Sequence, residues 1–78
     1  MKTVWVMTIG EFTVGVFDSK ARALNEFAGI KEQYTNYKTI RVNETDRYVS
    51  IDFSYTSADC PWHDYCNIIQ YEINKNTL

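Results

Sequence analysis

The stretch SKARALNEFAGIKEQY, residues 19–34, decides the fold because its apolar residues follow the period of a helix. Apolar side chains recur three or four positions apart and so share one helical face, while charged and amide side chains occupy the other face. Asp18 or Ser19 is placed to cap the first turn by accepting a backbone hydrogen bond. The residues of the apolar face are Ala23, Leu24, Phe27, Ile30 and Tyr34.

The segments on either side of this helix have the composition of strands. Residues 2–9 and 12–17 are rich in β-branched and aromatic residues and are joined by the short turn Gly10-Glu11. Gly15 predicts either a bulge or a close backbone approach in the second of them. Three further strands are expected at residues 37–42, 47–56 and 67–74, with a loop at residues 57–66. The side chains expected to face the core from these three strands are Ile40, Val42, Val49, Ile51, Phe53, Tyr55, Ile69, Tyr71 and Ile73.

The order β-β-α-β-β-β predicts an α+β fold with one helix packed on a mainly antiparallel sheet. A chain of 78 residues has room for one core, so residues 1–78 are expected to form a single domain. The polar tail at residues 75–78 is expected to fray. The crossover through the helix leaves two positions open for the third strand, beside the first strand or beside the second.

The first strand is apolar on both faces, with Val4 and Val6 on one face and Trp5 and Met7 on the other. One helix can cover only one face of a sheet. We therefore expect a loop, the C-terminal segment or another molecule to cover the remaining face, and a homodimer that buries Trp5 and Met7 across a two-fold axis is one hypothesis.

Composition excludes several classes of protein. Hydrophobic residues make up 45% of the chain, which is too many for a disordered segment. No apolar run approaches the length of about 18 residues that a membrane span needs. The N-terminal apolar run is interrupted by Gly10 and Glu11, unlike that of a signal peptide. We therefore expect a cytoplasmic protein with reduced thiols and without a cofactor.

Charge differs between the two halves of the chain. Residues 1–42 carry six bases and four acids, giving +2, whereas residues 43–78 carry two bases and six acids, giving −4. This difference suggests either an ordinary solvated surface or an acidic aromatic surface that docks on a basic partner. Most aromatic residues of the strands lie in the acidic half, which argues against direct nucleic-acid binding.

The densest group of reactive side chains is DCPWHDYC, residues 59–66. A metal site would use Cys60, His63 and Cys66, with Asp59 or Asp64 as a fourth ligand, but this spacing crowds three ligands into one loop. A disulfide is another alternative, although a reducing compartment disfavours it. Cysteine catalysis would need an orienting group and an oxyanion hole that the sequence does not offer. The remaining interpretation is that both cysteines anchor the loop as small buried side chains.

We expect the tip of this loop to bind a partner protein, because Trp and Tyr offer a large contact area at low entropic cost. The outer face of the fourth strand is the second candidate surface. No catalytic signature is present, so a non-enzymatic binding module is the leading hypothesis, and a small metal- or thiol-dependent protein is the alternative. The residues expected to contact the partner are Asp59, Trp62, His63, Asp64 and Tyr65 in the loop, with Tyr48 and Asp52 on the strand.

Residues 5–27, with the pattern WVMTIGEFTVGVFDSKxxAxxxF, resemble small uncharacterised proteins of bacteriophages and mobile elements. Those proteins combine an N-terminal hairpin with a helix that opens on a D-S-K-type cap. The resemblance implies a protein that binds and blocks a host protein in the host cytoplasm. The target could be a component of an antiviral defence system, as for anti-CRISPR proteins.

Overall fold

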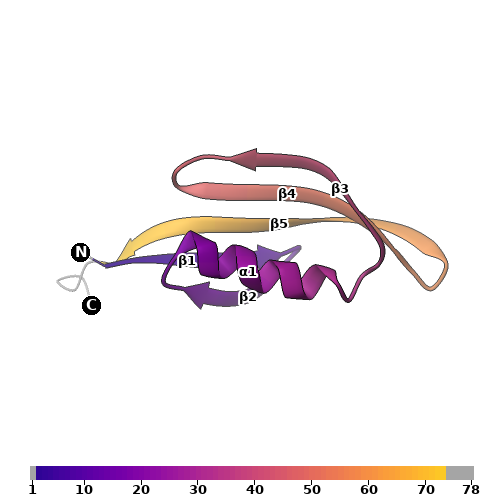
Figure 1. The fold of residues 1–78 in the computed structure, drawn as a ribbon, viewed down its shortest axis with the longest axis horizontal. Helices are drawn as coiled ribbons and strands as arrows, with labels where there is room; N and C mark the ends of the chain where they lie inside the picture. Colours follow the sequence, from indigo (N-terminus) through magenta and orange to yellow (C-terminus); the bar gives the residue numbers. More distant parts are fainter. Residues whose placement is uncertain (1, 74–78) are drawn as a thin grey trace.

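The computed structural model describes residues 2–73 and has the expected α+β architecture, with one helix on one face of a five-stranded antiparallel sheet (Figure 1). No helix within residues 2–73 has the length and apolar character needed to cross a membrane. The expected frayed tail at residues 75–78 lies outside the described residues, as does Asn74 at the expected end of the last strand. The elements in chain order are β1 (Lys2–Ile9), β2 (Phe12–Phe17), α1 (Lys20–Lys31), β3 (Thr35–Glu44), β4 (Tyr48–Ser57) and β5 (Cys60–Ile73).

The strand order in the sheet is β2-β1-β5-β4-β3, so the last strand of the chain is the central strand of the sheet. Helix α1 connects β2 at one edge to β3 at the opposite edge (Figure 1). The third strand therefore lies beside neither the first nor the second, and both positions considered from the sequence were wrong. Consecutive strands usually lie side by side, but here β2 and β3 lie at opposite edges of the sheet.

Helix α1 begins where the sequence predicts. The hydroxyl of Ser19 accepts a hydrogen bond from the backbone N–H of Arg22 at 3.1 Å, which caps the first turn. The helix ends at Lys31, earlier than the expected residue 34 and close to Ile30, the earlier end that Gly29 predicts as an alternative. The following residues form tighter turns, in which the N–H of Gln33 donates to the carbonyl of Ile30 and the N–H of Tyr34 donates to the carbonyl of Lys31.

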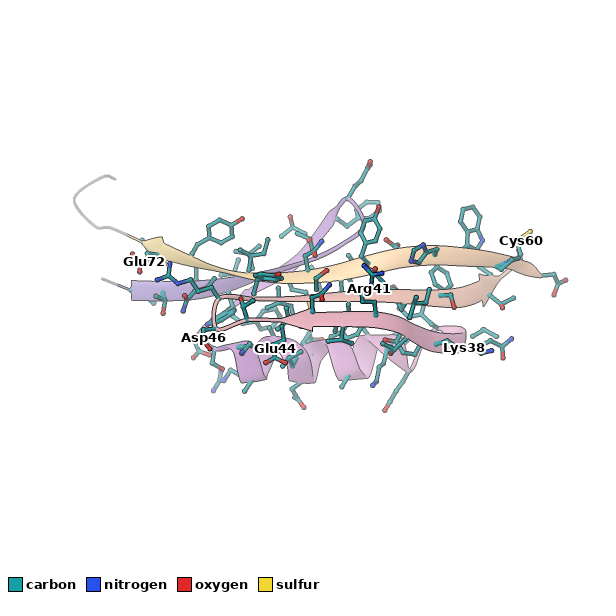
Figure 2. The ribbon with its side chains drawn as sticks, turned by 90° about the horizontal axis from the view of Figure 1, so that it is seen from above. Lys38, Arg41, Glu44, Asp46, Cys60 and Glu72 are labelled. Atoms are coloured by element: carbon teal, nitrogen blue, oxygen red, sulfur yellow. The ribbon has the colours of Figure 1, made fainter. Side chains whose placement is uncertain are left out.

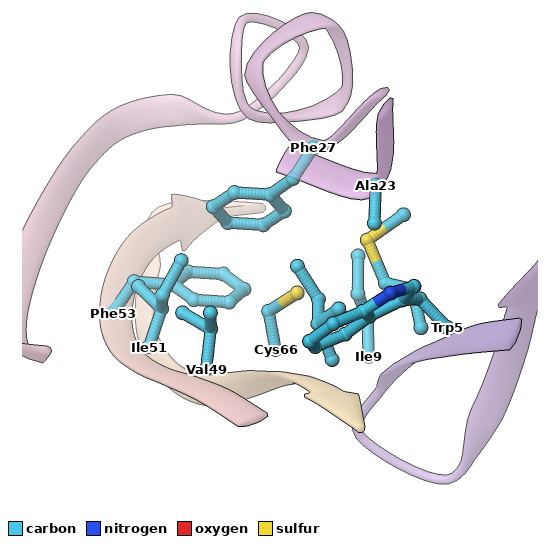
Figure 3. Close-up of a cluster of buried hydrophobic side chains, with 10 residues drawn as sticks. Trp5, Ile9, Ala23, Phe27, Val49, Ile51, Phe53 and Cys66 are labelled. Atoms are coloured by element: carbon cyan, nitrogen blue, oxygen red, sulfur yellow. The ribbon is translucent and has the colours of Figure 1, made fainter. Parts of the chain in front are cut away.

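The core lies between α1 and the face of the sheet that the helix covers (Figure 3). Each strand of the sheet that contributes to it does so through alternate residues, as strand geometry requires. No polar or charged residue is buried among the described residues. The buried side chains are Trp5, Met7, Ile9, Ala23, Phe27, Val49, Ile51, Phe53, Cys66 and Ile68.

The prediction that Trp5 and Met7 form an exposed dimer face is wrong. Both side chains are buried in the core of a single chain, together with Ala23 and Phe27 of the helix. The first strand is apolar on both faces, as predicted, but the helix covers the face with the larger side chains. Val4 and Val6 therefore lie on the uncovered face, and both are half-buried.

The expected loop at residues 57–66 is largely strand. A two-residue turn, Ala58-Asp59, joins β4 to β5, and both residues have positive φ values of 50° and 63°. Two consecutive positive φ values are typical of the type I′ turns that close tight hairpins. Cys60 already pairs with Ser57, so β5 begins seven residues before the position expected from the sequence.

The inward-facing residues of β3 and β5 were also predicted wrongly. In β5 the buried residues are Cys66 and Ile68, so that Ile69 and Tyr71 lie on the opposite face and are exposed. Ile73 is half-buried and belongs to the same alternating set as Ile69. Ile40 and Val42 are exposed because β3 is an edge strand whose pairing with β4 is interrupted near Ile40. The bulge predicted at Gly15 is confirmed, because the register of β1 with β2 shifts beside it.

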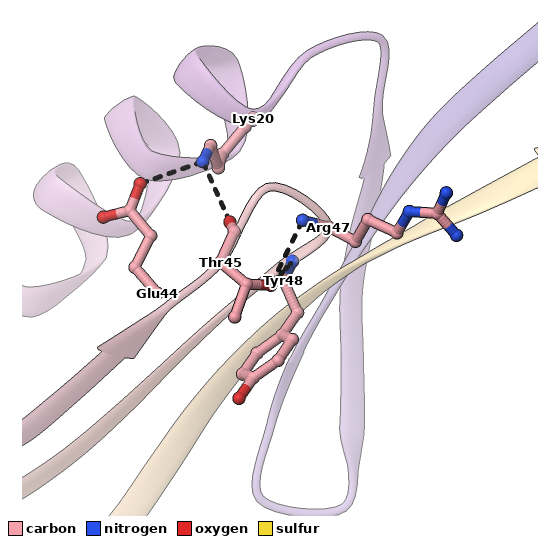
Figure 4. Close-up of polar contacts among 5 residues, drawn as sticks. All are labelled: Lys20, Glu44, Thr45, Arg47 and Tyr48. Atoms are coloured by element: carbon pink, nitrogen blue, oxygen red, sulfur yellow. Dashed lines mark hydrogen bonds and ion pairs between the residues drawn. The ribbon is translucent and has the colours of Figure 1, made fainter.

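A polar contact connects the start of the helix to the β3–β4 turn (Figure 4). The ammonium of Lys20 lies 2.9 Å from a carboxylate oxygen of Glu44 and 3.3 Å from the carbonyl oxygen of Thr45. Within the turn, the hydroxyl of Thr45 accepts hydrogen bonds from the backbone N–H groups of Arg47 and Tyr48. These contacts hold the turn against the helix, although an exposed ion pair of this kind stabilises by only about 0.2–1 kcal/mol.

Candidate functional site

One end of the β4–β5 hairpin extends beyond β1 and β2 (Figure 1). The hairpin is paired continuously from Tyr48 and Ile69 to Ser57 and Cys60. In contrast, the pairing of β1 with β5 ends at Cys66. Residues 60–65, here called the distal segment, therefore have a strand neighbour on the β4 side but not on the β1 side.

The backbone edge of the distal segment is protected against the addition of another strand. The carbonyl of Tyr65 accepts a hydrogen bond from the N–H of Gly10 at 3.0 Å, and the N–H of Tyr65 donates to the carboxylate of Asp64 at 2.9 Å. Pro61 has no N–H to offer. Natural proteins use such features to prevent edge-to-edge association. Recognition by this segment would therefore depend on its side chains.

The distal segment presents aromatic side chains on both of its faces. Trp62 is 55% exposed and lies opposite Tyr55, on the helix side of the sheet by register. Tyr65 is 49% exposed and lies opposite Asp52, on the uncovered side. The exposed ring of His63 packs edge-to-face against that of Tyr65, with their centroids 6.1 Å apart.

The four residues expected at a loop tip are therefore divided between the faces of a strand. His63 and Tyr65 belong to the uncovered face, while Trp62 and Asp64 belong to the other. Asp64 is half-buried and has a structural position, because its carboxylate accepts the N–H of Tyr65 and lies against Gly10. Asp59 is exposed in the tight turn.

A cluster of aromatic rings packs next to the distal segment. Tyr55, the neighbour of Trp62 across the hairpin, packs on Tyr34 with ring centroids 4.6 Å apart. Phe53 contacts both tyrosines and is fully buried. Burial, and then the neighbouring Tyr55, raise the pKa of Tyr34 above its usual value, so its hydroxyl stays neutral. The strand that carries the exposed aromatic residues is thus held in place by packed aromatic side chains.

The uncovered face of the sheet, here called the open face, carries the second predicted surface. Figure 2 shows the sheet from its edge, with the helix on one side only. Asp52 lies between Tyr65 and Arg41 in one row across β5, β4 and β3. Tyr48 is exposed on the same face, four residues away along β4. The structure thus brings together Asp52, His63 and Tyr65, whereas Tyr48 lies on the same face but nearer to its other end, in the row of Ile69.

The open face is not acidic, contrary to what the charge of the C-terminal half suggests. By register, the charged residues that the strands place on it are the bases Lys2, Lys38 and Arg41 and the acid Asp52. Glu44 and Asp64 belong to the side of the sheet that carries the helix. The alternation of side chains in the strands, and not the position in the chain, determines how charge is distributed between the faces.

The cysteines and the histidine are too far apart to act together. Cys66 is buried in the core, and burial raises the pKa of its thiol from 9.0 to about 12, which keeps it protonated and unreactive. Cys60 is exposed beside the turn, six residues away along an extended strand, or roughly 20 Å. This separation exceeds the reach of a disulfide. The structure therefore does not support the metal, disulfide or cysteine-catalysis alternatives, and no group of three potential metal ligands is found within residues 2–73.

Sequence reasoning missed an apolar area at the other end of the open face. It is formed by residues of β1, β2, β4 and β5 that lie side by side in the sheet. The sequence did contain a signal for this area, because residues 2–9 are apolar on both faces and this indicated an uncovered face. The uncovered face was, however, assigned to Trp5 and Met7 instead of Val4 and Val6.

Comparison of the chain with protein-family models, with curated proteins and with solved structures gives no match. The resemblance of residues 5–27 to small bacteriophage proteins therefore stays a prediction. The surfaces that bear on function are the two described above, the distal segment and the open face.

Proposed function

We propose that this protein is a non-enzymatic binding module that recognises another protein through the distal segment and the adjoining part of the open face. The observation that carries the proposal is the exposure of Trp62 and Tyr65 on a strand that extends beyond β1. Aromatic residues of this kind dominate the energetics of many protein interfaces.

The rigidity of the support favours this proposal. Trp62 and Tyr65 belong to a fully paired hairpin, and Tyr55 and Phe53 hold that hairpin in a packed aromatic cluster. A partner would therefore bind side chains that are already ordered, which reduces the entropic cost of association. The protected backbone edge directs recognition to side chains and limits uncontrolled strand addition.

The polar residues beside the aromatic ones indicate how a partner would be oriented. Arg41 extends from β3 on the side of the sheet away from the helix (Figure 2), in the same row as Asp52 and Tyr65. Lys38 follows in the next row, opposite Ser54. An apolar or aromatic contact at Tyr65 flanked by carboxylates that reach Arg41 and Lys38 would match this surface. The resemblance to bacteriophage proteins supports a host protein as the partner and inhibition as the outcome.

The test is affinity capture followed by a measurement with purified components. Tagged wild-type protein serves as bait in a bacterial lysate, the captured protein is identified by mass spectrometry and purified, and its affinity is measured by calorimetry. Replacing both Trp62 and Tyr65 by Ala should weaken binding by at least about 100-fold, since each is expected to be a hot-spot residue.

The matched control is Val16→Ala, which shortens an apolar side chain that is 62% exposed on edge strand β2, in the row of Ile69 and four residues along the strands from the row of Tyr65. This variant should bind like the wild type. In the double variant Trp5 is the one remaining tryptophan, so its fluorescence reports whether the core is intact. Unchanged affinity of a folded double variant, or an equal loss in the Val16 control, would contradict the proposal.

A further inference from the structure

A continuous apolar area covers the end of the open face that lies away from the distal segment. By register it comprises two neighbouring rows of side chains, on the face opposite the helix. Val16 is 62% exposed at its edge, and Ile69 is 39% exposed at its centre. The residues of this apolar patch are Val4, Val6, Val16, Tyr48, Ile69 and Tyr71.

The strand register makes the apolar patch contiguous. Val6 pairs with Val16 on one side and with Ile69 on the other, and Ile69 pairs with Tyr48. These four side chains form one row across β2, β1, β5 and β4. Val4 and Tyr71 form the adjacent row. The patch therefore crosses four strands from two hairpins, β1–β2 and β4–β5, that are far apart in the sequence.

The row that follows the Val6–Ile69 row toward the distal segment consists of small, uncharged polar residues. It continues across all five strands, so that neutral hydrogen-bonding groups separate the apolar patch from the charged row of Arg41 and Asp52. Within residues 2–73 the helix lies on the opposite face, and no described element covers these rows. The residues of the neutral row are Thr13, Thr8, Asn67, Ser50 and Asn43.

This arrangement is self-complementary. Each row runs across the strands and has one chemical character, and β5 is the central strand. A two-fold axis along β5, lying between two molecules, superimposes each row on the same row of the second copy. Ile69 then meets Ile69 of the second copy, and Tyr48 meets its Val6, while neutral polar groups face neutral polar groups. The two-fold rotation places edge strand β3, which carries Arg41, opposite edge strand β2 of the second copy. Arg41 of one copy therefore does not face Arg41 of the other.

We propose that a second copy of this chain packs on the open face and forms a two-layer sandwich with the apolar patch at its centre. In a sheet, neighbouring strands lie about 4.8 Å apart and successive residues of one strand lie about 3.3 Å apart. Five strands over a length of seven residues therefore cover an area of roughly 500 Å². Two copies would bury roughly 1,000 Å² in total, the lower limit for a specific interface. The dimer is therefore weak and depends on concentration, and it uses a surface distinct from Trp62 and the edge of the distal segment.

Sedimentation velocity of the full chain from about 5 to about 500 μM tests this proposal, with a micromolar dissociation constant expected. The weight-average mass should rise from 9.2 kDa toward twice that value. Ile69→Asp places two carboxylates at the centre of the dimer and should weaken association by at least about 100-fold. Val16→Asp, at the exposed edge of the same row, should also shift the protein toward monomer while carrying less risk to folding.

The matched control is Val42→Asp, the same substitution as Val16→Asp at a valine that is 53% exposed and lies on the helix side of the sheet by its pairing with Ile51, and it should dimerise like the wild type. Circular dichroism establishes that each variant is folded, and Val16→Asp decides the test if Ile69→Asp does not fold. A monomeric wild type at the highest concentration overturns the proposal. So does a folded Ile69→Asp or Val16→Asp variant that dimerises normally, or an equal loss of dimer in Val42→Asp. Binding of a different protein by a monomer would leave the proposed function intact and remove the dimer alone.

Discussion

Phe53 is the residue on which the stability of the distal segment most depends. Its side chain is fully buried, and four other rings lie around it, with centroids at 5.3 Å for Tyr34 and Tyr37, 5.8 Å for Phe27 and 5.9 Å for Tyr55. Phe53→Ala removes the ring that joins the helix to the hairpin and leaves a cavity among four aromatic neighbours. Large-to-small changes of this kind cost about 3–5 kcal/mol of unfolding free energy.

This cost is a large fraction of the total stability, which is about 4–12 kcal/mol for 78 residues. At about 4–8 °C per kcal/mol, the melting temperature should fall by at least about 12 °C. Urea denaturation followed by tryptophan fluorescence measures the free energy, because Trp5 is buried in the core. The exposed Phe12→Ala control should change stability by less than about 0.5 kcal/mol. A loss below about 1 kcal/mol for Phe53→Ala would refute the assignment of Phe53 to the centre of the cluster.

Two other properties of the chain lead to further predictions. Gly10→Ala should destabilise by about 1–2 kcal/mol, because Gly10 has a φ of +60° and an added Cβ would lie 3.0 Å from the Asp64 carboxylate. Gly29→Ala should stabilise by about 0.5–1 kcal/mol, because the helix leaves open space there. A higher urea midpoint for Gly10→Ala, or a lower one for Gly29→Ala, would contradict the corresponding prediction. Burial raises the pKa of Cys66 from 9.0 to about 12, so the unfolded chain loses its proton first. Stability is therefore full below pH 9 and falls by up to about 1.4 kcal/mol per pH unit as pH rises toward 12. Cys66→Val should flatten this dependence in urea denaturation measured at pH 8 and pH 10, and an unchanged slope would disprove it.

The sequence predicted the elements whose patterns are local. The helix start, the strands at residues 2–9 and 12–17 and the bulge at Gly15 depend on nearby residues, and all are confirmed. The fourth strand was displaced by one residue, and its inward set from Val49 to Phe53 is buried as predicted. Local patterning was sufficient in these segments because each has one buried face and a clear period.

The errors occurred where distant segments determine the structure. Pro61 and its polar neighbours suggested a loop, but Pro61 lies in a stretch of β5 without a β1 partner, where a missing N–H does no harm. For β5, Ile69 and Tyr71 were predicted to face the core because they are apolar. The residues that do face the core are Cys66 and Ile68, which form a less obvious pattern. The position of β5 between β1 and β4 could not be read from any local pattern. The candidate surfaces depend on that register and were therefore only partly predicted.

The central position of β5 also affects how the protein acquires its structure during synthesis. Before residues 60–73 emerge from the ribosome, β1 and β4 have no contact with each other through the sheet, and each has an unpaired edge. The β1–β2 hairpin with its helix and the β3–β4 hairpin would exist only as separate, unstable pieces. Insertion of the last strand joins them in a single step. The sheet is therefore expected to form only after residues 60–73 have emerged, and a nascent or truncated chain would be open to proteolysis and aggregation until that strand arrives.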